Sequence, residues 1–243
     1  MRAFLVKFFV RHYLQTQNSL LNYMTSQDFL DTIEDRHLRI LDIGSGPAVT
    51  SLAVTDMLFC VLRHLRDQED RSGKKVIVDY ILNDISSFCL GTGQQMLTDY
   101  FRIYTKRGSQ ITHGQIFRIQ IAFPKNMNQL QRINCNLGSY DIATLSYVLS
   151  PLNENTNFKD LVNGLLNVEN LFSRNGRILI LQDKFQPAIM KKISRSLGTS
   201  MQKEESTQEV YPKRNTNETY TYSYYSCLYP PGRNGLVRQK SVA

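Results

Sequence analysis

The chain has 243 residues, of which 42% are hydrophobic and 21% charged. This composition excludes wholesale disorder, a collagen-like repeat and a coiled-coil rod, and it indicates one soluble globular domain spanning residues 1–243. The formal net charge of +8, from 29 Lys and Arg against 21 Asp and Glu, favours an anionic partner such as RNA, DNA or a lipid surface.

The first 36 residues are expected to form N-terminal helices. Residues 1–24 contain basic but no acidic residues and a cluster of apolar ones, a pattern that also resembles a signal or transit peptide. Lys7 splits the apolar block and no small-residue cleavage site follows, so we favour an amphipathic helix that packs on the domain. A second short helix is expected from Ser26 towards Asp35. No apolar run approaches the roughly 20 residues of a membrane-spanning helix.

Residues 37–183 alternate between strand and helix patterns. Short apolar runs predict strands at 37–43, 76–82, 116–123, 141–145 and 177–181. Helical spacing predicts helices at 47–65 and 158–172, and between them a helix that Ser86 or Ser87 can cap and that ends at Tyr104. Asn175-Gly176 indicates a helix stop and a turn before the last of these strands. This alternation predicts an α/β fold with a doubly wound, mostly parallel sheet covered by helices on both faces.

Residues 184–243 are expected to form a C-terminal helix and a hairpin, with a polar stretch to about Gln208 and then a tyrosine-rich segment, 218–229. The alternation of Tyr with Thr and Ser predicts an antiparallel edge strand before the Pro230-Pro231 turn. Tyrosines in such a segment can also stack nucleic-acid bases, an interpretation that we rank below the strand.

A glycine turn, Gly44-Ser45-Gly46, follows the first strand of this sheet. Ligands of open parallel sheets bind at the carboxyl ends of the strands, and glycines let the backbone approach them closely. Val49 stands where a dinucleotide fingerprint needs its third glycine, which disfavours a nicotinamide-dependent oxidoreductase, and no P-loop follows. Asp42 would repel a pyrophosphate but can accept a hydrogen bond from an ammonium group, so the turn favours a cationic ligand.

Residues 40–48, Ile-Leu-Asp-Ile-Gly-Ser-Gly-Pro-Ala, resemble motif I of the class I S-adenosylmethionine-dependent methyltransferases. Residues 82–86 (Leu-Asn-Asp-Ile-Ser), 140–149 and 175–181 are similar to the motifs of the family's second, fourth and fifth strands, so the resemblance covers about residues 36–183. It implies a Rossmann-like seven-stranded sheet with an antiparallel C-terminal hairpin, and S-adenosylmethionine as the cofactor.

The resemblance also implies roles for particular residues. The glycine turn with Asp42 would hold the amino-acid end of the cofactor, and Asp84, at the end of the second strand, would hold the ribose. The cofactor-binding residues implied in this way are Asp42, Gly44, Ser45, Gly46, Pro47, Asp84, Ile85, Ser146 and Tyr147. No catalytic residue and no metal ligand is assigned.

The sequence departs from the family pattern in two places. Ala48 replaces the usual third glycine, which we take as a mild change because alanine also permits close packing of helix on sheet. Asp84 lies 38 positions after Gly46, against about 20 in a typical nucleotide-binding unit. Asp79 competes for the ribose role but falls inside the strand. A domain that has kept this fold and lost its ligand remains an alternative.

The methyl acceptor is not identified by the sequence. The Asn/Asp-Pro-Pro-Tyr/Phe motif of amino-directed nucleic-acid methyltransferases is absent, since Ser146-Tyr147-Val148-Leu149 stands in its place. No cysteine follows closely on the fourth or fifth strand, which argues against cysteine-dependent methylation of pyrimidine C5. Residues 146–152 bear a fainter likeness to the mitochondrial small-ribosomal-subunit assembly methyltransferases. His113 is expected to be a surface histidine.

The positive charge is concentrated in two segments of the chain. Residues 101–139 carry six Lys or Arg and no acidic residue, and residues 174–195 carry six and one. If these two segments share a face, they form a landing surface for RNA or a ribosome; otherwise they are solvated loops. Asp183 and Lys184 either line an acceptor pocket or end a solvated loop. Four scattered cysteines indicate a reducing, intracellular compartment, cytoplasmic or mitochondrial.

Two functions therefore stand for testing. The first is an S-adenosylmethionine-dependent methyltransferase with an unidentified acceptor, for which RNA is a candidate. The second is a non-catalytic RNA- or ribosome-binding module on the same scaffold.

Overall fold

The computed structural model describes residues 2–34, 37–69, 75–105, 111–125, 129–130, 132, 138–146, 148, 160, 163–164, 171–183, 187–197, 202–209 and 219–229. Its principal elements are α1 (Arg2–Met24), α2 (Gln27–Glu34), β1 (His37–Ile43), α3 (Val49–Glu69), β2 (Val76–Asn83), α4 (Ser87–Thr105), β3 (Ile111–Ile119), β4 (Tyr140–Ser146), β5 (Phe172–Asp183), α7 (Pro187–Ser196), β6 (Gln202–Glu209) and β7 (Thr219–Tyr229).

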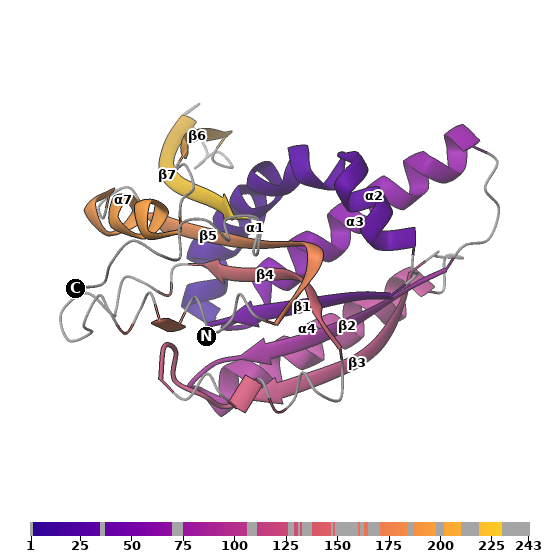
Figure 1. Ribbon diagram of the computed structural model, residues 1–243, viewed down its shortest axis with the longest axis horizontal. Helices are drawn as coiled ribbons and strands as arrows, with labels where there is room; N and C mark the ends of the chain where they lie inside the picture. The colour runs from indigo at the N-terminus through magenta and orange to yellow at the C-terminus, as the bar shows by residue number, and fades with distance from the viewer. Residues whose placement is uncertain are drawn as a thin grey trace.

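The strands form one seven-stranded sheet in the order β3-β2-β1-β4-β5-β7-β6 (Figure 1). Strands β3, β2, β1, β4 and β5 are parallel, whereas β7 is antiparallel to both β5 and β6. The chain runs outward from β1 to β3 and then from β4 in the other direction, so the order reverses between β1 and β4. Ligands of such sheets bind at the carboxyl ends of the strands at this reversal.

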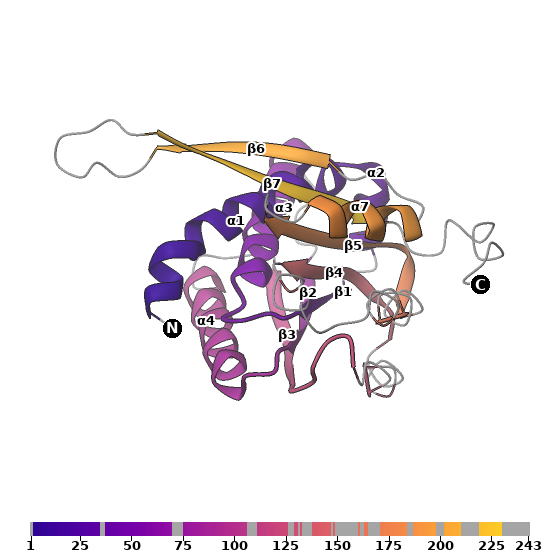
Figure 2. The ribbon, with the colours of Figure 1, turned by 90° about the vertical axis from the view of Figure 1, so that its left-hand side faces the viewer.

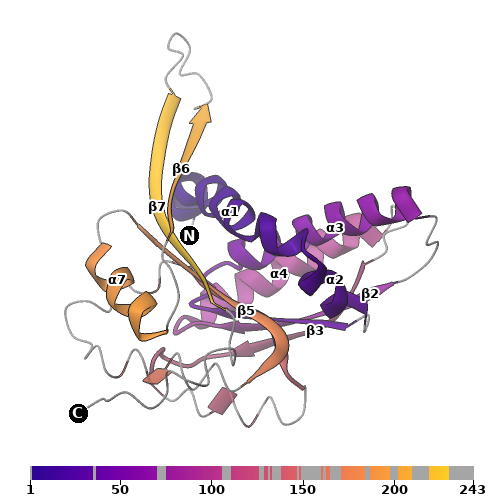
Figure 3. The same ribbon diagram turned by 45° about the horizontal axis from the view of Figure 1, so that its top comes forward.

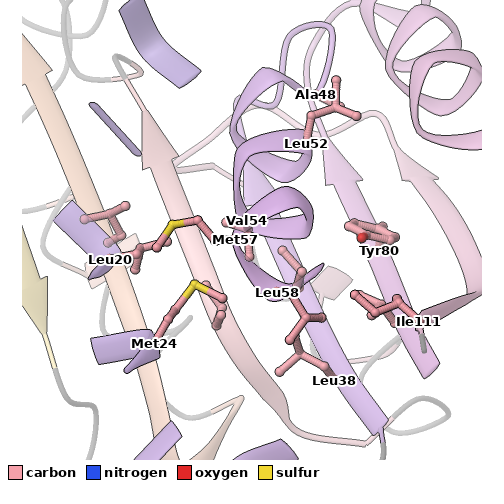
Figure 4. Close-up of a cluster of buried hydrophobic side chains, with 14 of the residues drawn as sticks. Leu20, Met24, Leu38, Ala48, Leu52, Val54, Met57, Leu58, Tyr80 and Ile111 are labelled. Carbon is pink, nitrogen blue, oxygen red and sulfur yellow. The ribbon is translucent and has the colours of Figure 1, made fainter. Parts of the chain in front are cut away.

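Helices cover both faces of the sheet, as a parallel sheet requires. Leu38 and Ile40 of β1 pack in a core with side chains of α1, α2, α3 and α4, and Leu41 and Ile43 pack in a second core with Met190 and other side chains of α7. Figure 3 shows α1, α3 and α4 on one side of the sheet and α7 on the other. Figure 4 shows part of the first core, where α3 lies over the sheet. The predicted doubly wound, mostly parallel seven-stranded sheet with an antiparallel C-terminal hairpin is therefore confirmed.

Helix α1 packs on the domain through α3, as predicted. The hydroxyl of Tyr13 in α1 donates to Asp56 Oδ2 in α3 at 2.6 Å, and the hydroxyls of Tyr100 and Tyr104 in α4 donate to Asp56 Oδ1. Burial raises the pKa of Asp56, but the hydrogen bonds from Tyr100, Tyr13 and Tyr104 outweigh it and lower the pKa below its usual value. One carboxylate thus joins three helices. In the described ranges, no helix has the length and apolarity needed to cross a bilayer.

Three predicted boundaries are wrong. Strand β3 spans Ile111–Ile119 and not 116–123, because its first half is polar and lies on the edge of the sheet. Asn175-Gly176 is not a turn but lies inside β5, where the register with β4 shifts; a Cβ on Gly176 would lie 3.1 Å from the carbonyl oxygen of Tyr140. The predicted helix at 158–172 falls mostly outside the described residues, and its last residue opens β5.

The tyrosine-rich segment is a strand, β7, but it is not the edge of the sheet. Strand β6 forms the edge, and β7 lies between β5 and β6. Strand β6 (Gln-Lys-Glu-Glu-Ser-Thr-Gln-Glu) contains no apolar residue, so no hydrophobic pattern revealed it. Residues 219–223 of β7 pair only with β6, and the two strands extend together past the rest of the sheet (Figure 2).

Candidate functional site

The glycine turn follows β1 at the reversal of the strand order. Gly44 and Gly46 have φ angles of 66° and 52°, in the left-handed region that favours glycine. A Cβ on Gly44 would lie 2.3 Å from Cγ2 of Val148, so only glycine allows the turn to approach the segment after β4. A Cβ on Gly46 would meet nothing within 4 Å, because the turn opens there into free space.

Ala48 has a φ of 59° and is the only non-glycine residue with positive φ among those described. The family's third glycine is therefore expected at this position for its backbone conformation as well as for close packing, and our interpretation of the change as mild was incomplete. A left-handed conformation costs a residue with a Cβ about 1 kcal/mol. The Cβ of Ala48 is accommodated because α4 has Gly93 opposite it, where a Cβ would lie 3.0 Å away.

Asp84 joins the end of β2 to the glycine turn. Its Oδ2 accepts a hydrogen bond from the backbone N–H of Gly46 at 2.9 Å, and its Oδ1 accepts one from Ser86 at 2.8 Å. The N–H of Ser45 in turn donates to the carbonyl oxygen of Asn83 at 2.9 Å. Ser86 caps α4 as predicted, since its Oγ accepts from the N–H of Cys89. These hydrogen bonds fix the glycine turn after β1 relative to the loop after β2.

A cavity of about 450 Å³ opens between these loops. Its walls come from α1, the glycine turn and the start of α3, the end of β2, the segment after β3, and the end of β4. The lining residues are His12, Gly44, Ser45, Gly46, Pro47, Val49, Thr50, Asn83, Asp84, Ile85, Ile121, Ala122, Phe123, Ser146 and Val148. Seven of the nine predicted cofactor-binding residues therefore meet around one cavity of a size typical for small-molecule sites.

Two buried polar atoms in the cavity wall have no hydrogen-bond partner. They are Oγ of Ser45 and Oδ1 of Asn83, in residues that are 7% and 1% exposed. The amide nitrogen of Asn83 is satisfied, because it donates to the carbonyl oxygens of Ile119 and Ile121 at 3.1 and 3.0 Å. Since leaving a buried polar atom unpaired costs about 1–3 kcal/mol, these two atoms are suited to a polar ligand.

Asp42 lies behind the turn and not in the cavity wall. It is 1% exposed, and its two carboxylate oxygens accept hydrogen bonds from the hydroxyls of Ser51 in α3 and Thr144 in β4, at 2.7 and 2.8 Å. Burial raises the pKa of Asp42 to about 6, although these hydrogen bonds lower it. Asp42 therefore links β1, β4 and α3 beneath the turn. The sequence predicted a direct contact between Asp42 and a ligand ammonium group, but Asp42 does not line the cavity.

The other predicted residues are distributed as follows. Ser146 lines the cavity and accepts a hydrogen bond from Thr50 Oγ1 at 3.1 Å, whereas Tyr147 and Lys184 lie outside the described residues. Asp79 is remote from the cavity, since it bonds to His37 at 2.6 Å and to the N–H of Gln115 at the opposite end of the sheet. His113 is an exposed residue, as predicted.

Sequence reasoning missed several lining residues. Asn83 directly precedes Asp84 at the end of an apolar strand, so its position was a usable signal. His12 reaches the cavity from α1, and Val148 reaches it from the far side of Gly44. These two contacts depend on tertiary packing, for which a single sequence carries no signal.

In the described part of the chain, the strands of the two basic segments are not neighbours in the sheet. Strands β3 and β5, which belong to different segments, are separated by three strands. Arg102 lies in the last turn of α4, which leads away from the cavity, and pairs with Asp99 at 2.9 Å. Arg177 is buried and pairs with Asp28 at 2.6 Å. Lys106 and Arg107 are outside the described residues.

No protein-family model matches the chain, and no curated protein sequence is significantly similar to it. Solved structures with a similar fold include a precorrin-6y C5,15-methyltransferase from Geobacter metallireducens, at 12% identity over 84% of this chain and 88% of that one, with a TM-score of 0.45. A SAM-dependent methyltransferase from Leishmania major has 12% identity over 90% and 82% of the two chains, with a TM-score of 0.43. An rRNA methylase from Streptococcus thermophilus has 9% identity over 85% and 98%, with a TM-score of 0.42.

Proposed function

We propose that this protein binds S-adenosylmethionine in the cavity and transfers the methyl group to an acceptor. The observation that carries the proposal is the pair of buried, unpartnered atoms, Ser45 Oγ and Asn83 Oδ1, beside Asp84 in a cavity built on a glycine turn. One atom can donate and the other can only accept, so they suit a ligand with both kinds of polar group.

The residues around the cavity fit the parts of this cofactor. The amino-acid end would lie against the open side of Gly46. Asp84 would hold the ribose, because each of its oxygens accepts only one backbone hydrogen bond in the described contacts and has a further lone pair for a ribose hydroxyl. Ile85, at 69% exposure, offers an apolar surface for the adenine ring.

Asp42 would act through the turn. Its hydrogen bonds to Ser51 and Thr144 fix the ends of β1 and β4 relative to α3, and this fixes the place of Gly44 and Gly46. We therefore assign Asp42 a positioning role, in place of the direct contact that the sequence suggested.

Methyl transfer is a direct displacement in which the bound cofactor supplies an electrophilic methyl group on a sulfonium, and the acceptor gives up a proton. The protein's contribution is to align the acceptor and keep water out. Ile121, Phe123 and Val148 make part of the cavity wall apolar, which suits this task.

Calorimetric titration with S-adenosylhomocysteine tests the proposal. Wild type should bind, and Asp84→Ala should weaken binding by about tenfold or more, because hydrogen bonds to a carboxylate contribute about 1.5–3 kcal/mol each. Asp99→Ala is the matched control, since Asp99 is an exposed carboxylate on the adjoining helix. Absence of binding by the folded wild type, or equal binding by Asp84→Ala, would refute the proposal.

A second candidate is a non-catalytic RNA- or ribosome-binding module on this scaffold. The six basic and no acidic residues of 101–139 favour it. It predicts salt-sensitive RNA binding without methyl incorporation. Incubation with radiolabelled S-adenosylmethionine and total RNA, protein or small-molecule extracts separates the two candidates and identifies the acceptor class.

A further inference from the structure

Two large apolar side chains lie exposed where β2 leads into α4, and one of them lines the cavity. Ile85 and Phe88 are 69% and 67% exposed, more than any other large hydrophobic residue in the described part of the chain. They are three residues apart, across the turn from β2 into α4, and Ile85 also lines the cavity. Single exposed apolar residues are common, but two adjacent ones continuous with a ligand cavity mark a contact surface.

A positive charge stands next to this apolar rim. Arg118 is exposed on edge strand β3, where it pairs in register with Leu82 near the carboxyl end of β2. Its guanidinium lies beside α4, since Nη1 would be 3.9 Å from a Cβ on Gly91. Gly91 is one turn after Phe88 and therefore on the same face of the helix. Among the described residues, no acidic side chain pairs with Arg118.

A polar side chain completes the surface. The amide nitrogen of Gln120 donates to the carbonyl oxygen of Ile85 at 2.9 Å, and this places the exposed side chain against the rim. Because Ile85 is assigned to the adenine ring, we name the three side chains of Phe88, Arg118 and Gln120 the rim surface. It combines an aromatic face, a cation and an amide beside the mouth of the cavity.

We infer that the rim surface binds single-stranded RNA and presents one nucleotide to the cavity. An aromatic face stacks an unpaired base, a guanidinium binds phosphate, and an amide contacts base edges, which is the chemistry by which proteins recognise single-stranded RNA. The guanidinium of Arg118, which lies beside α4, complements the phosphate backbone. The inference deepens the proposed function, on which it rests for the identity of the acceptor.

The acceptor chemistry favours RNA over DNA. The chain lacks the motif for methylating exocyclic amines, and Cys227, the one described cysteine beyond β4, is 1% exposed in β7. Methylation of an exocyclic amine and cysteine-dependent methylation of pyrimidine C5 are two reactions open to a DNA base, and the chain is not equipped for either. RNA also offers the 2′-hydroxyl as an acceptor, which DNA lacks.

Fluorescence anisotropy with a labelled single strand of about 12 nucleotides tests the inference. The probes are this RNA, the DNA strand of the same sequence, and the RNA duplex, each with and without S-adenosylhomocysteine. The single-stranded RNA should bind tightest. Phe88→Ala should weaken its binding by about tenfold. Arg118→Gln should weaken it and reduce the slope of log affinity against log salt by about one.

The controls are a matched apolar residue and a matched cation. Ile103→Ala removes another exposed apolar side chain of α4, and Lys191→Gln removes an exposed cation on α7. Both should bind RNA as wild type does, and all four variants should bind S-adenosylhomocysteine normally.

The inference is overturned if wild type binds no single-stranded RNA, if Phe88→Ala and Arg118→Gln both bind it as wild type does, or if DNA or duplex RNA binds equally well. A protein partner on this surface would produce the first result. RNA binding with the expected variant pattern but without S-adenosylhomocysteine binding would refute the proposed methyltransferase and leave the rim surface as an RNA site. The opposite result would refute the RNA inference alone.

Discussion

The two ends of the parallel sheet bury polar groups in contrasting ways. At the amino end, Asp79 accepts hydrogen bonds from His37 and Gln115, and Asp141 accepts them from the N–H of Arg39 and the hydroxyl of Ser173. All four carboxylate oxygens are paired there. At the carboxyl end, Ser45 Oγ and Asn83 Oδ1 are equally buried and have no partner, and both belong to residues that line the cavity.

This difference indicates that the buried polar groups of the amino end stabilise the fold, whereas those of the carboxyl end are available to a ligand. A satisfied buried network stabilises the fold, whereas unpaired polar atoms cost stability unless a ligand meets them. The amino end is not free of such atoms, since Arg39 Nε has no partner either. The candidate site is distinguished because two unpaired atoms belong to residues that line one cavity.

The largest expected effect is at the amino end. Asp79→Ala should lower the free energy of unfolding by about 3 kcal/mol, because it leaves His37 and the N–H of Gln115 without their buried acceptor. Urea denaturation measures this, with Asp99→Ala as an exposed control that should change stability by about 0.5 kcal/mol or less. Binding of S-adenosylhomocysteine by folded Asp79→Ala should be normal; its loss would contradict the division between the two ends.

Asp42 should make stability depend on pH. Its pKa of about 6 in the folded protein lies above the value of about 4 in the unfolded chain. The protonated form of Asp42 is therefore favoured in the folded protein. Its contribution to stability, about 3 kcal/mol, is present in full below pH 4 and is lost as the pH rises through 6. Asp42→Asn should remove this component from denaturation curves recorded across that range.

Burial also raises the pKa of Asp141, so a smaller pH dependence should remain in Asp42→Asn. An unchanged pH dependence in that variant would show that Asp42 titrates normally in the folded protein.

Removing a buried atom that has no hydrogen-bond partner should raise the free energy of unfolding, whereas removing a paired one should lower it. Ser45→Ala should raise the free energy of unfolding by about 1 kcal/mol, because the buried hydroxyl has no partner, while the N–H of residue 45 still donates to Asn83. The same variant should bind S-adenosylhomocysteine about fivefold more weakly. Parallel denaturation and calorimetry measure both effects. A loss of stability would indicate that the hydroxyl has a partner in the free protein.

The smallest expected effect concerns the backbone of the turn. Ala48→Gly should stabilise the protein by about 0.5–1 kcal/mol by relieving a φ of 59°. Thermal denaturation measures it, and cofactor affinity should stay the same because residue 48 does not line the cavity. Destabilisation would mean that the packing of the Ala48 methyl group near Gly93 outweighs the backbone strain.

The features that the sequence predicts well are local. Apolar runs predicted the positions of β1, β2 and β4. The residues that directly follow the first two strands include Gly44, Gly46 and Asp84, so the same runs also indicated part of the site. The features that it missed depend on contacts between distant segments. His12 lines the cavity because α1 packs on α3. Asp42 does not line it, because its carboxylate is buried in hydrogen bonds to Ser51 and Thr144.

Strand β6 illustrates a different limit. It has no apolar residue and pairs with β7 at the edge of the sheet. Hydrophobic periodicity cannot locate such a strand, because the periodicity records burial and not hydrogen bonding.

The position of β7 has a consequence for the order in which the protein is synthesised. It is the last described strand in the chain, yet it lies inside the sheet, against buried residues of β5 such as Leu179 and Ile180. Until β7 leaves the ribosome, β5 presents an apolar edge with unpaired backbone groups, which favours aggregation. Polypeptides that stop before residue 219 would keep that edge, so premature termination near the end of the message would produce aggregating protein and not a shortened folded domain.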